Sequence, residues 1–445
     1  MYESLYPVTH HFYPLQYCAD RSALPFQAFL EQLNCDKELY TENLIYIHIP
    51  YCDKRCLFCP FHVRITHDDG IYEKYIRALE REIAMLSRMR YIGGMRFKAV
   101  YFGGGSPSLL HVDHVARLYS ALKNSFDIED DAEWTFEGEP HGLSNRTLLS
   151  FLLEHGIRRI SYGVQTFDRN LRQALTIAAT VEDVLAALSL AREVGFREIN
   201  IDMMFHLPGQ TLDALELDVC EIARYGFDSV DYYYMSYYAL PPSVFVQMDS
   251  GGFPRQPPLG LRIDMNYHIR HRMNELGYTH VTDHVFSKSG FGSVYYRLLW
   301  GGGSGEFSAE TLALGASARG YLNGISYANT LAHDSYIQQV QRDELPVFKV
   351  SDRVADPRSR AAVFFPKFFE IREDRLPSDD TTRRTIRSLV ANGLARRCDG
   401  KVILTDTGKD WIPNITADLL DENQRRIGDG WVERLNSQHA NRVTL

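Results

Sequence analysis

The sequence predicts an α/β fold in which six strand–helix units form a partial (β/α) barrel. An α+β covering region follows and contains a small winged-helix-like module near the carboxyl terminus. Three observations lead to this prediction. From about residue 44 to residue 276, apolar runs typical of strands alternate with segments of helical periodicity. Such alternation is typical of a parallel sheet with right-handed crossovers. After about residue 300 the pattern changes, and a helix, a short strand, a turn and a second strand follow one another.

The expected elements each have a local signal. Leu44–Ile49 is an apolar, β-branched run and predicts the first strand. A helix follows it, because apolar residues recur at helical spacing from Ile71 to Leu86. Thr180 and Asp183 resemble a capping box that opens a later helix. The further strands are expected at 98–102, 133–137, 159–164, 198–205 and 229–237, and the further helices at 111–126, 145–154, 180–194, 212–225 and 260–276.

We expect three parts in the chain: an amino-terminal extension (1–40), the partial barrel (41–300) and a carboxyl-terminal domain (301–445). Residues 301–305 are four glycines and a serine and are typical of a flexible loop. The winged-helix-like module begins with a helix at 381–392 and includes a strand at 401–405. Such modules often bind DNA, but the charge around this one is mixed, so we favour a packing or lid role.

The composition argues against a nucleic-acid-binding, a membrane-spanning or a secreted protein. The chain has 445 residues, 45% of them hydrophobic, and a net charge of −9. That charge argues against nucleic acid as a partner. No apolar run is long enough to span a membrane, and the first residues lack a secretory signal. An odd number of cysteines, seven, also argues for a reducing compartment. We therefore expect a cytoplasmic protein without a membrane span.

Three of the seven cysteines lie within eight residues, directly after the first predicted strand. Cys52, Cys56 and Cys59 have the spacing Cys-x3-Cys-x2-Cys. A 4Fe–4S cluster takes four ligands, so three thiolates leave one iron open. That iron can bind the amino and carboxylate groups of S-adenosylmethionine (SAM), and an electron from the cluster can then release a 5′-deoxyadenosyl radical. A zinc site completed by His62 is the alternative.

The segment from Tyr46 to Cys52, Tyr-Ile-His-Ile-Pro-Tyr-Cys, resembles the radical SAM superfamily. More narrowly, the chain is similar to the oxygen-independent coproporphyrinogen III dehydrogenase-like family, which includes haem chaperones and class C radical SAM methyltransferases. The resemblance covers roughly residues 42–420 and implies a barrel of the radical SAM type. It also implies a 4Fe–4S cluster on the three cysteines and one or two SAM molecules as cofactors.

The same resemblance implies a SAM pocket at successive strand ends, where barrels of this kind place their chemistry. Glycines there let the backbone approach a ligand closely. Glu137 matches a family acid that contacts SAM, although Glu139 lies two residues away and is an alternative. Four polar groups at successive strand ends favour one shared pocket. The expected SAM-binding residues are Gly103, Gly104, Gly105, Ser106, Glu137, Gln165 and Asp202.

Two residues are expected to be catalytic. Tyr46 lies in the first strand, and the resemblance implies that it approaches SAM near the cluster; His48, two residues on, is a site residue or a core histidine. His284, in the segment Thr-Asp-His-Val-Phe, resembles the family segment that borders the substrate. A histidine there could exchange a proton near neutral pH. The alternative is a structural histidine bonded to Asp283 or to the backbone.

The sequence departs from the family at three positions. The arginine that pairs with the SAM carboxylate is replaced by Ile177 or Ala178, and Arg172 comes too early in the chain. His206 stands where a glycine is expected, and it could bind substrate or fill space. Phe61 replaces a further cysteine, which argues against plain coproporphyrinogen decarboxylation.

These observations favour a class C methyltransferase-type enzyme that modifies a planar aromatic or tetrapyrrole small molecule. A coproporphyrinogen III dehydrogenase, which performs oxidative decarboxylation, and a haem chaperone without turnover are the alternatives. An enzyme of either kind needs a reducing electron donor, which we expect to be flavodoxin- or ferredoxin-like.

Overall fold

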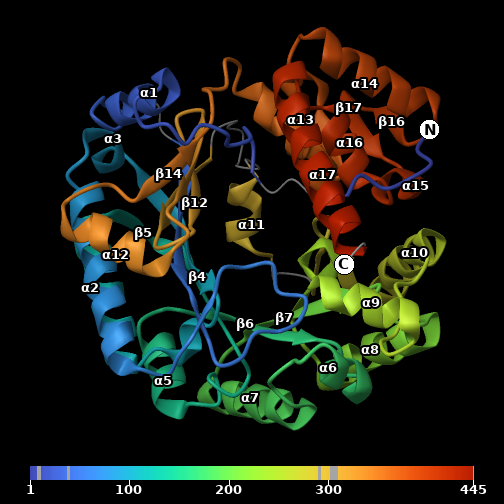
Figure 1. Ribbon diagram of the computed structural model, residues 1–445, viewed down its shortest axis with the longest axis horizontal. Coiled ribbons are helices and arrows are strands. Elements are labelled where there is room, and N and C mark those ends of the chain that lie inside the picture. Colours follow the sequence, from blue (N-terminus) through green and yellow to red (C-terminus); the bar gives the residue numbers. More distant parts are fainter. Residues whose placement is uncertain (8–11, 38–40, 289–291, 301–308, 444–445) are drawn as a thin grey trace.

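The computed structural model describes residues 1–443 except 8–11, 38–40, 289–291 and 301–308, with side chains up to residue 434. The predicted glycine loop at 301–305 therefore lies outside the described residues. Twelve of the described strands form one curved sheet with helices around its outer face (Figure 1). Seven neighbouring strands in its middle are parallel, in the order β11-β1-β4-β5-β6-β7-β8. This arrangement confirms the predicted α/β fold with a central parallel sheet.

The six predicted strand–helix units are present. The third strand begins at Asp127 rather than at 133, and the sixth ends at Tyr234 rather than at 237, where a 3-10 turn begins. The strands are β1 (Glu42–Ile49), β4 (Arg96–Gly104), β5 (Asp127–Gly138), β6 (Arg159–Gln165), β7 (Glu198–Phe205) and β8 (Ser229–Tyr234). The main helices that follow them are α2 (Asp69–Leu86), α4 (Val112–Ser125), α5 (Arg146–Glu154), α7 (Val181–Val194), α8 (Leu212–Tyr225) and α10 (Leu259–Glu275).

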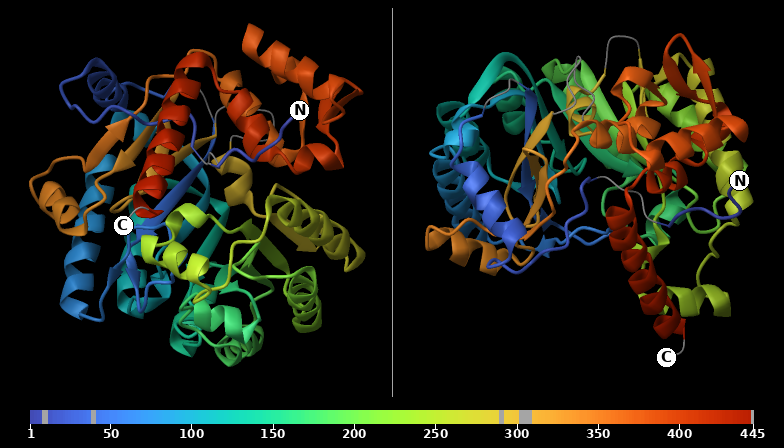
Figure 2. Two further views of the ribbon diagram at one scale, coloured as in Figure 1. Left: turned by 45° about the vertical axis from the view of Figure 1, so that its right-hand side comes forward. Right: turned by 90° about the horizontal axis from the view of Figure 1, so that it is seen from above.

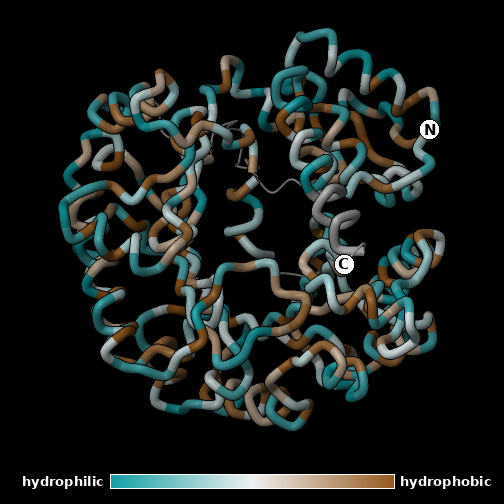
Figure 3. The backbone as a smooth tube through the Cα atoms, in the orientation of Figure 1, coloured by the Kyte–Doolittle hydropathy of each residue, from teal (hydrophilic) through white to brown (hydrophobic). Residues whose placement is uncertain are grey.

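The outer helices form because each has an apolar stripe that faces the sheet. In α2, the buried residues Tyr72, Tyr75, Ile76, Leu79 and Ile83 recur at helical spacing. The opposite, solvent-facing turns of the peripheral helices are hydrophilic in Figure 3. The predicted capping box at the start of α7 is also present, with both of its hydrogen bonds formed.

The sheet continues past the six units on both sides. β11 (Glu310–Leu314) lies parallel to β1, and β12 (Arg319–Leu322), β13 (Ile325–Asn329) and β14 (Val347–Val350) extend the sheet antiparallel. At the other end, β10 (Val285–Lys288) and β9 (Tyr278–His280) pair antiparallel beyond β8. These strands were not predicted. Because one sheet runs across residue 300, the proposed division into domains stays a prediction.

The helix α11 (Val294–Leu299) lies on the concave side of the sheet (Figure 1). Glu133 of β5 accepts hydrogen bonds from the backbone N–H groups of Val294, at 2.9 Å, and Tyr295, at 3.0 Å. A carboxylate suits these N–H groups because the first turn of a helix leaves them without intrahelical partners. Tyr295 and Tyr296 consequently fill part of the barrel interior.

The carboxyl-terminal module has the predicted helix, strand, turn and strand. These are α14 (Asp380–Ala391), β16 (Ala395–Cys398), the Asp399–Gly400 turn with positive φ at both residues, and β17 (Lys401–Leu404). β15 (Glu370–Arg372) completes its three-stranded sheet. The amino-terminal residues pack on this region: the ring centroids of Tyr2 and Trp411 are 5.4 Å apart, and Figure 2 shows the amino terminus beside it.

The remaining elements connect these parts. No helix in the described ranges is long and apolar enough to cross a membrane. The connecting elements are α1 (Leu24–Leu33), β2 (Tyr51–Cys52), β3 (Arg64–Ile65), α3 (Arg90–Gly93), α6 (Arg169–Ala174), α9 (Pro242–Ser250), α12 (His333–Gln341), α13 (Arg358–Phe368), α15 (Asp406–Lys409), α16 (Ile412–Asp418) and α17 (Glu422–Val443).

Candidate active site

The cysteine loop lies just beyond the carboxyl end of β1. Cys52 is buried at the end of β2, and Cys56 and Cys59 are half-buried in the loop that follows. All three are free thiols. The backbone N–H of Leu57 donates to the carbonyl of Leu175 at 3.0 Å, which ties the loop to the segment after α6. The loop is thus held at the edge of the sheet where the parallel strands end.

The three thiols form one electrostatic group. Burial, together with the nearby Glu139 carboxylate and Cys59, raises the pKa of Cys56 to about 12. Burial likewise raises the pKa of Cys52 and of Cys59. Three buried thiolates beside a carboxylate need a cationic partner, which an iron–sulfur cluster provides. Among the residues searched, no group of three His, Cys, Asp or Glu side chains is arranged for a single metal ion.

The glycine run at the end of β4 forms a close-packed turn. A Cβ atom on Gly103 would lie 2.5 Å from Oε2 of Glu137, and one on Gly105 would lie 2.5 Å from the carbonyl oxygen of Tyr51. Gly104 has a φ of +114°, and a Cβ atom there would lie 2.6 Å from Nδ1 of His48. The absence of side chains is therefore required by the packing itself. Gly104 and Gly105 are partly accessible, so their backbone can be approached by a ligand.

Glu137 lies behind this turn and is half-buried. Its carboxylate accepts hydrogen bonds from the Tyr101 hydroxyl and the Gly104 N–H, yet burial raises its pKa to about 7. Ser106 does not face it directly: the Ser106 hydroxyl accepts from the backbone N–H of Glu139 at 3.1 Å. Glu137 is thus the acid that contacts the glycine turn, whereas Glu139 lies closer to the cysteines and raises their pKa.

Gln165 and Asp202 occupy the next two strands. Gln165 has a φ of +71°, and the β6–β7 pairing shifts register between Gly163 and Gln165. A non-glycine residue in this conformation is strained, and such bulges re-aim side chains at functional sites. Asp202 is in pairing register with Asp231 of β8. Burial, the Asp231 carboxylate and the Glu137 carboxylate together raise the pKa of Asp202 well above its ordinary value.

Tyr46 and His48 point to the same side of β1. The Tyr46 hydroxyl lies 3.1 Å from Nδ1 of His48. The ring of Tyr46 stacks on Tyr101, and Tyr101 lies 4.2 Å from Tyr295 of α11, measured between ring centroids. The structure therefore brings Tyr46 and His48 together with the glycine turn and Glu137 at the mouth of the barrel.

His284 lies in the bend just before β10, the strand that pairs with β8. Its Nδ1 atom lies 2.6 Å from Oδ1 of Asp283, and Oδ2 of the same carboxylate accepts from Nζ of Lys367 at 2.7 Å. The ring stacks on Tyr233 at 4.5 Å between centroids, and its buried Nε2 has no hydrogen-bond partner among the described residues. The observed contact with Asp283 is the one that a structural histidine was expected to make.

Two departures from the family pattern have structural explanations. Arg172 is buried, and NH1 donates to the carbonyls of Val164 at 2.6 Å and Thr166 at 2.8 Å. Its donors therefore hold the end of β6 rather than a ligand. His206 has a φ of +59°, a conformation that a glycine would adopt more easily, and its Nε2 lies 3.3 Å from the carbonyl of Pro258.

Sequence reasoning missed Tyr101, Asp231 and Tyr295. Tyr101 could have been found, because it alternates with Gly103 along one strand and so faces the same side. Asp231 is likewise an acid inside an apolar strand, Ser229–Tyr234. Tyr295 had no such signal, because its position depends on the entry of α11 into the barrel.

Comparison with known proteins agrees with this geometry. Residues 46–219 match the radical SAM superfamily model. The chain is 27% identical to the haem chaperone HemW of Bacillus subtilis over 82% of this chain and 95% of that protein. It is 31% identical to the oxygen-independent coproporphyrinogen III oxidase of Escherichia coli K12, over 45% of this chain and 43% of that one. It is 26% identical to the anaerobilin synthase of Escherichia coli O157:H7, over 85% and 84%.

The solved structure of coproporphyrinogen III oxidase (HemN) from Escherichia coli has the same fold. It aligns with a TM-score of 0.74 at 22% identity, covering 88% of this chain and 93% of that one. Superfamily members use a 4Fe–4S cluster together with SAM, and the three thiols described above suit such a cluster. The chain thus contains a radical SAM domain, and it is a radical SAM enzyme related to haem chaperones and oxygen-independent coproporphyrinogen III oxidases.

Proposed function

We propose that this enzyme cleaves SAM reductively and modifies a planar tetrapyrrole or related aromatic small molecule in a class C methyltransferase-type reaction. The observation that carries the proposal is the meeting of three free thiols, a glycine turn and a half-buried acid, Glu137, at the ends of β1, β4 and β5. Active sites of parallel barrels lie at this edge of the sheet.

In this proposal the residues of the chain bind and orient the reactants. Cys52, Cys56 and Cys59 hold the cluster, which when bound supplies the electron that splits SAM into methionine and a 5′-deoxyadenosyl radical. The glycine turn at 103–105 and Ser106 approach SAM through backbone, and Glu137 accepts a hydrogen bond from it. Gln165 and Asp202 continue the SAM pocket along the next strands.

The substrate class is supported by aromatic lining and by the relatives. Tyr46, Tyr101 and Tyr295 form a continuous aromatic wall on the concave side of the sheet. Flat ligands pack well on such rings. The names of the relatives refer to haem and to coproporphyrinogen, both of them tetrapyrroles.

Oxidative decarboxylation and haem delivery without turnover are the second candidates. The haem chaperone is favoured by one specific observation: Arg172, the arginine nearest in sequence to the expected SAM-carboxylate partner, donates to backbone carbonyls instead. A weakened SAM site fits a protein that keeps its cluster but transfers haem.

One experiment separates these functions. Anaerobically reconstituted protein is incubated with SAM, haem or coproporphyrinogen III, and either dithionite or a flavodoxin- or ferredoxin-like donor. Both 5′-deoxyadenosine and S-adenosylhomocysteine in the wild type, and neither in Cys56→Ala, support methyl transfer. 5′-Deoxyadenosine with loss of carbon dioxide from coproporphyrinogen identifies decarboxylation. Haem binding with neither nucleoside product contradicts the proposal and identifies a chaperone.

A further inference from the structure

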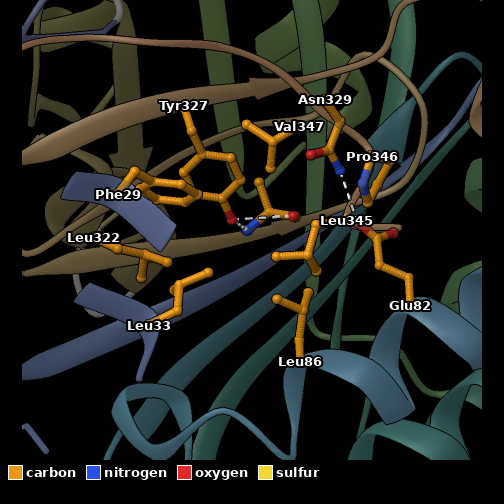
Figure 4. Close-up of a pocket in the computed structure, with 11 residues that line it drawn as sticks. Phe29, Leu33, Glu82, Leu86, Leu322, Tyr327, Asn329, Leu345, Pro346 and Val347 are labelled. Atoms are coloured by element: carbon orange, nitrogen blue, oxygen red, sulfur yellow. Dashed lines mark hydrogen bonds between the residues drawn. The ribbon is translucent and has the colours of Figure 1, made fainter. Parts of the chain in front are cut away.

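Hydrogen bonds hold the turn between β11 and β12, residues 315–318, beside the active site. Its Gly315 N–H donates to the Glu82 carboxylate at 2.8 Å, and the Ala316 N–H donates to the Tyr75 hydroxyl at 2.9 Å. The Tyr75 hydroxyl in turn donates to the backbone carbonyl of His48 at 2.8 Å. Figure 4 shows Glu82 on the helix side of the sheet, where Asn329 also donates to it at 2.8 Å. The turn is therefore fixed against the carboxyl end of β1.

Arg319 ends this turn and carries a guanidinium without an acidic partner among the described residues. Its guanidinium carbon lies 5.3 Å from the ring centroid of Phe12, a residue of the amino-terminal segment. The side chain is exposed to solvent, yet surrounding protein lowers its pKa. Ser317, in the same turn, has a φ of +60°, so its conformation is strained.

Arg319 lies within electrostatic reach of the residues at the end of β1. Burial, followed by the nearby His62 and Arg319, lowers the pKa of His48 to about 4. The imidazole is consequently neutral at neutral pH. Its buried Nε2 has no hydrogen-bond partner among the described residues. His48 contacts Tyr46 through its other nitrogen. Thr311 of β11 is in pairing register with Leu44 of β1 and with Tyr321 of β12. Arg319, two residues before Tyr321, therefore lies on the same face of the sheet as Tyr46 of the wall that we assign to the substrate.

We propose that Arg319 binds a carboxylate of the ligand at the mouth of the barrel, on the β1–β11 side and opposite the segment after β6. This inference rests on the proposed function, because it adds a substrate contact to that same site. A guanidinium presents paired donors that match a carboxylate, and partial desolvation strengthens such a pair. The carboxylate can come from a tetrapyrrole propionate or from the amino-acid end of a second SAM molecule. The chemistry is the same for both.

The test compares each ligand with its carboxylate-free analogue. Coproporphyrin III and its tetramethyl ester are titrated by fluorescence in one detergent buffer, and SAM and decarboxylated SAM are measured by equilibrium dialysis. The proteins are full-length and anaerobically reconstituted: wild type, Arg319→Ala, Arg319→Lys, and Arg396→Ala as a control at an exposed arginine of β16. Iron content and thermal midpoint are recorded for each, which detects any loss of folding.

We expect Arg319→Ala to lower the affinity for one of the two carboxylate ligands, coproporphyrin III or SAM, by about tenfold to a hundredfold. Hydrogen bonds to charged groups have this strength. The ester or decarboxylated analogue of that ligand should bind wild type and variant equally, and Arg319→Lys should recover part of the loss. A porphyrin effect identifies the propionate, and an effect on the second equivalent of SAM identifies the amino-acid carboxylate. If the variant loses affinity equally for a carboxylate ligand and its analogue, or loses affinity for neither carboxylate ligand, the inference about Arg319 is wrong but the proposed function is unaffected. A wild-type protein that binds neither porphyrin nor SAM would overturn it together with the proposed function.

Discussion

Replacing Gly104 by alanine is the most direct test of the glycine turn. Gly104 has a φ of +114°, and the added Cβ would lie 2.6 Å from Nδ1 and 2.7 Å from Cε1 of His48. Contacts this short do not persist, so His48 or the turn must move. His48 is buried and is held by Tyr46, whose hydroxyl lies 3.1 Å from Nδ1. The substitution therefore perturbs the backbone that is proposed to contact SAM.

Two costs add at this position. A side chain at such a φ costs about 1–2 kcal/mol, and overpacking a buried ring costs about 1–3 kcal/mol more. The free energy of unfolding should therefore fall by about 2–5 kcal/mol, the sum of these two ranges. Gly195 is a matched control, because its φ is +116° but its added Cβ would meet only Leu153, at 3.4 Å. Gly195→Ala carries the backbone cost alone, about 1–2 kcal/mol.

The assay is SAM binding by equilibrium dialysis, with iron content and denaturant unfolding measured on the same samples. Gly104→Ala should retain the iron and bind SAM at least about tenfold more weakly, a change of about 1.4 kcal/mol. Gly195→Ala should bind SAM as the wild type does. Unchanged SAM affinity in Gly104→Ala would refute the cradle and leave the glycine run as a tight turn. Equal losses in both variants would attribute the effect to general destabilisation.

Four further predictions concern the cluster, two buried charges and His284. Alanine at any one of the three loop cysteines should abolish iron binding, whereas alanine at any of the other four should not, as iron and sulfide analysis will show. Lys367→Met should lower the free energy of unfolding by about 3–5 kcal/mol, because it leaves the Asp283 carboxylate buried without its ammonium partner; adding Asp283→Asn should restore part of that loss. Burial raises the pKa of Glu82 to about 7 in the folded protein, so stability present below pH 4.5 is lost as the pH rises through 7. In thermal melts, wild type should lose stability over this range relative to Glu82→Gln, by a few kcal/mol. His284→Ala should retain iron and SAM binding but lose substrate conversion; conversion at the wild-type rate would leave His284 as scaffold.

The six strand–helix units could be predicted because their signals are local. Most of these strands are buried on both faces and read as apolar runs, whereas β5 is acidic and partly exposed in its first half. The outer helices have apolar stripes that repeat at helical spacing. The partner of β1 could not be predicted in the same way. Asn43 of β1 pairs with Glu310 of β11, far along the chain, and nothing in either segment specifies the other. Pairing of this kind is decided by tertiary packing.

The same distinction applies to the candidate site: some of its residues could be predicted from local sequence, and others could not. The cysteine spacing and the glycine run are visible in sequence because their chemistry depends on residue type and spacing. The positive φ of Gln165 has no local signal, since glutamine does not favour that conformation. Arg319 is one arginine among many in the sequence. Arg319 becomes a candidate ligand-binding residue only in the folded protein, which places it near His48 and without an acidic partner among the described residues.

Glu82 explains how these distant segments are joined. It lies on the buried face of α2, the helix that follows the cysteine loop, where an apolar residue would suit the stripe. Its carboxylate accepts from the Tyr336 hydroxyl at 2.6 Å, the Gly315 N–H at 2.8 Å and the Asn329 amide at 2.8 Å. Three donors offset much of the cost of burying the group. Because Tyr75, about two turns earlier along that helix face, binds both the turn and the carbonyl of His48, α2 fixes the cysteine-loop strand and the Arg319 turn relative to each other.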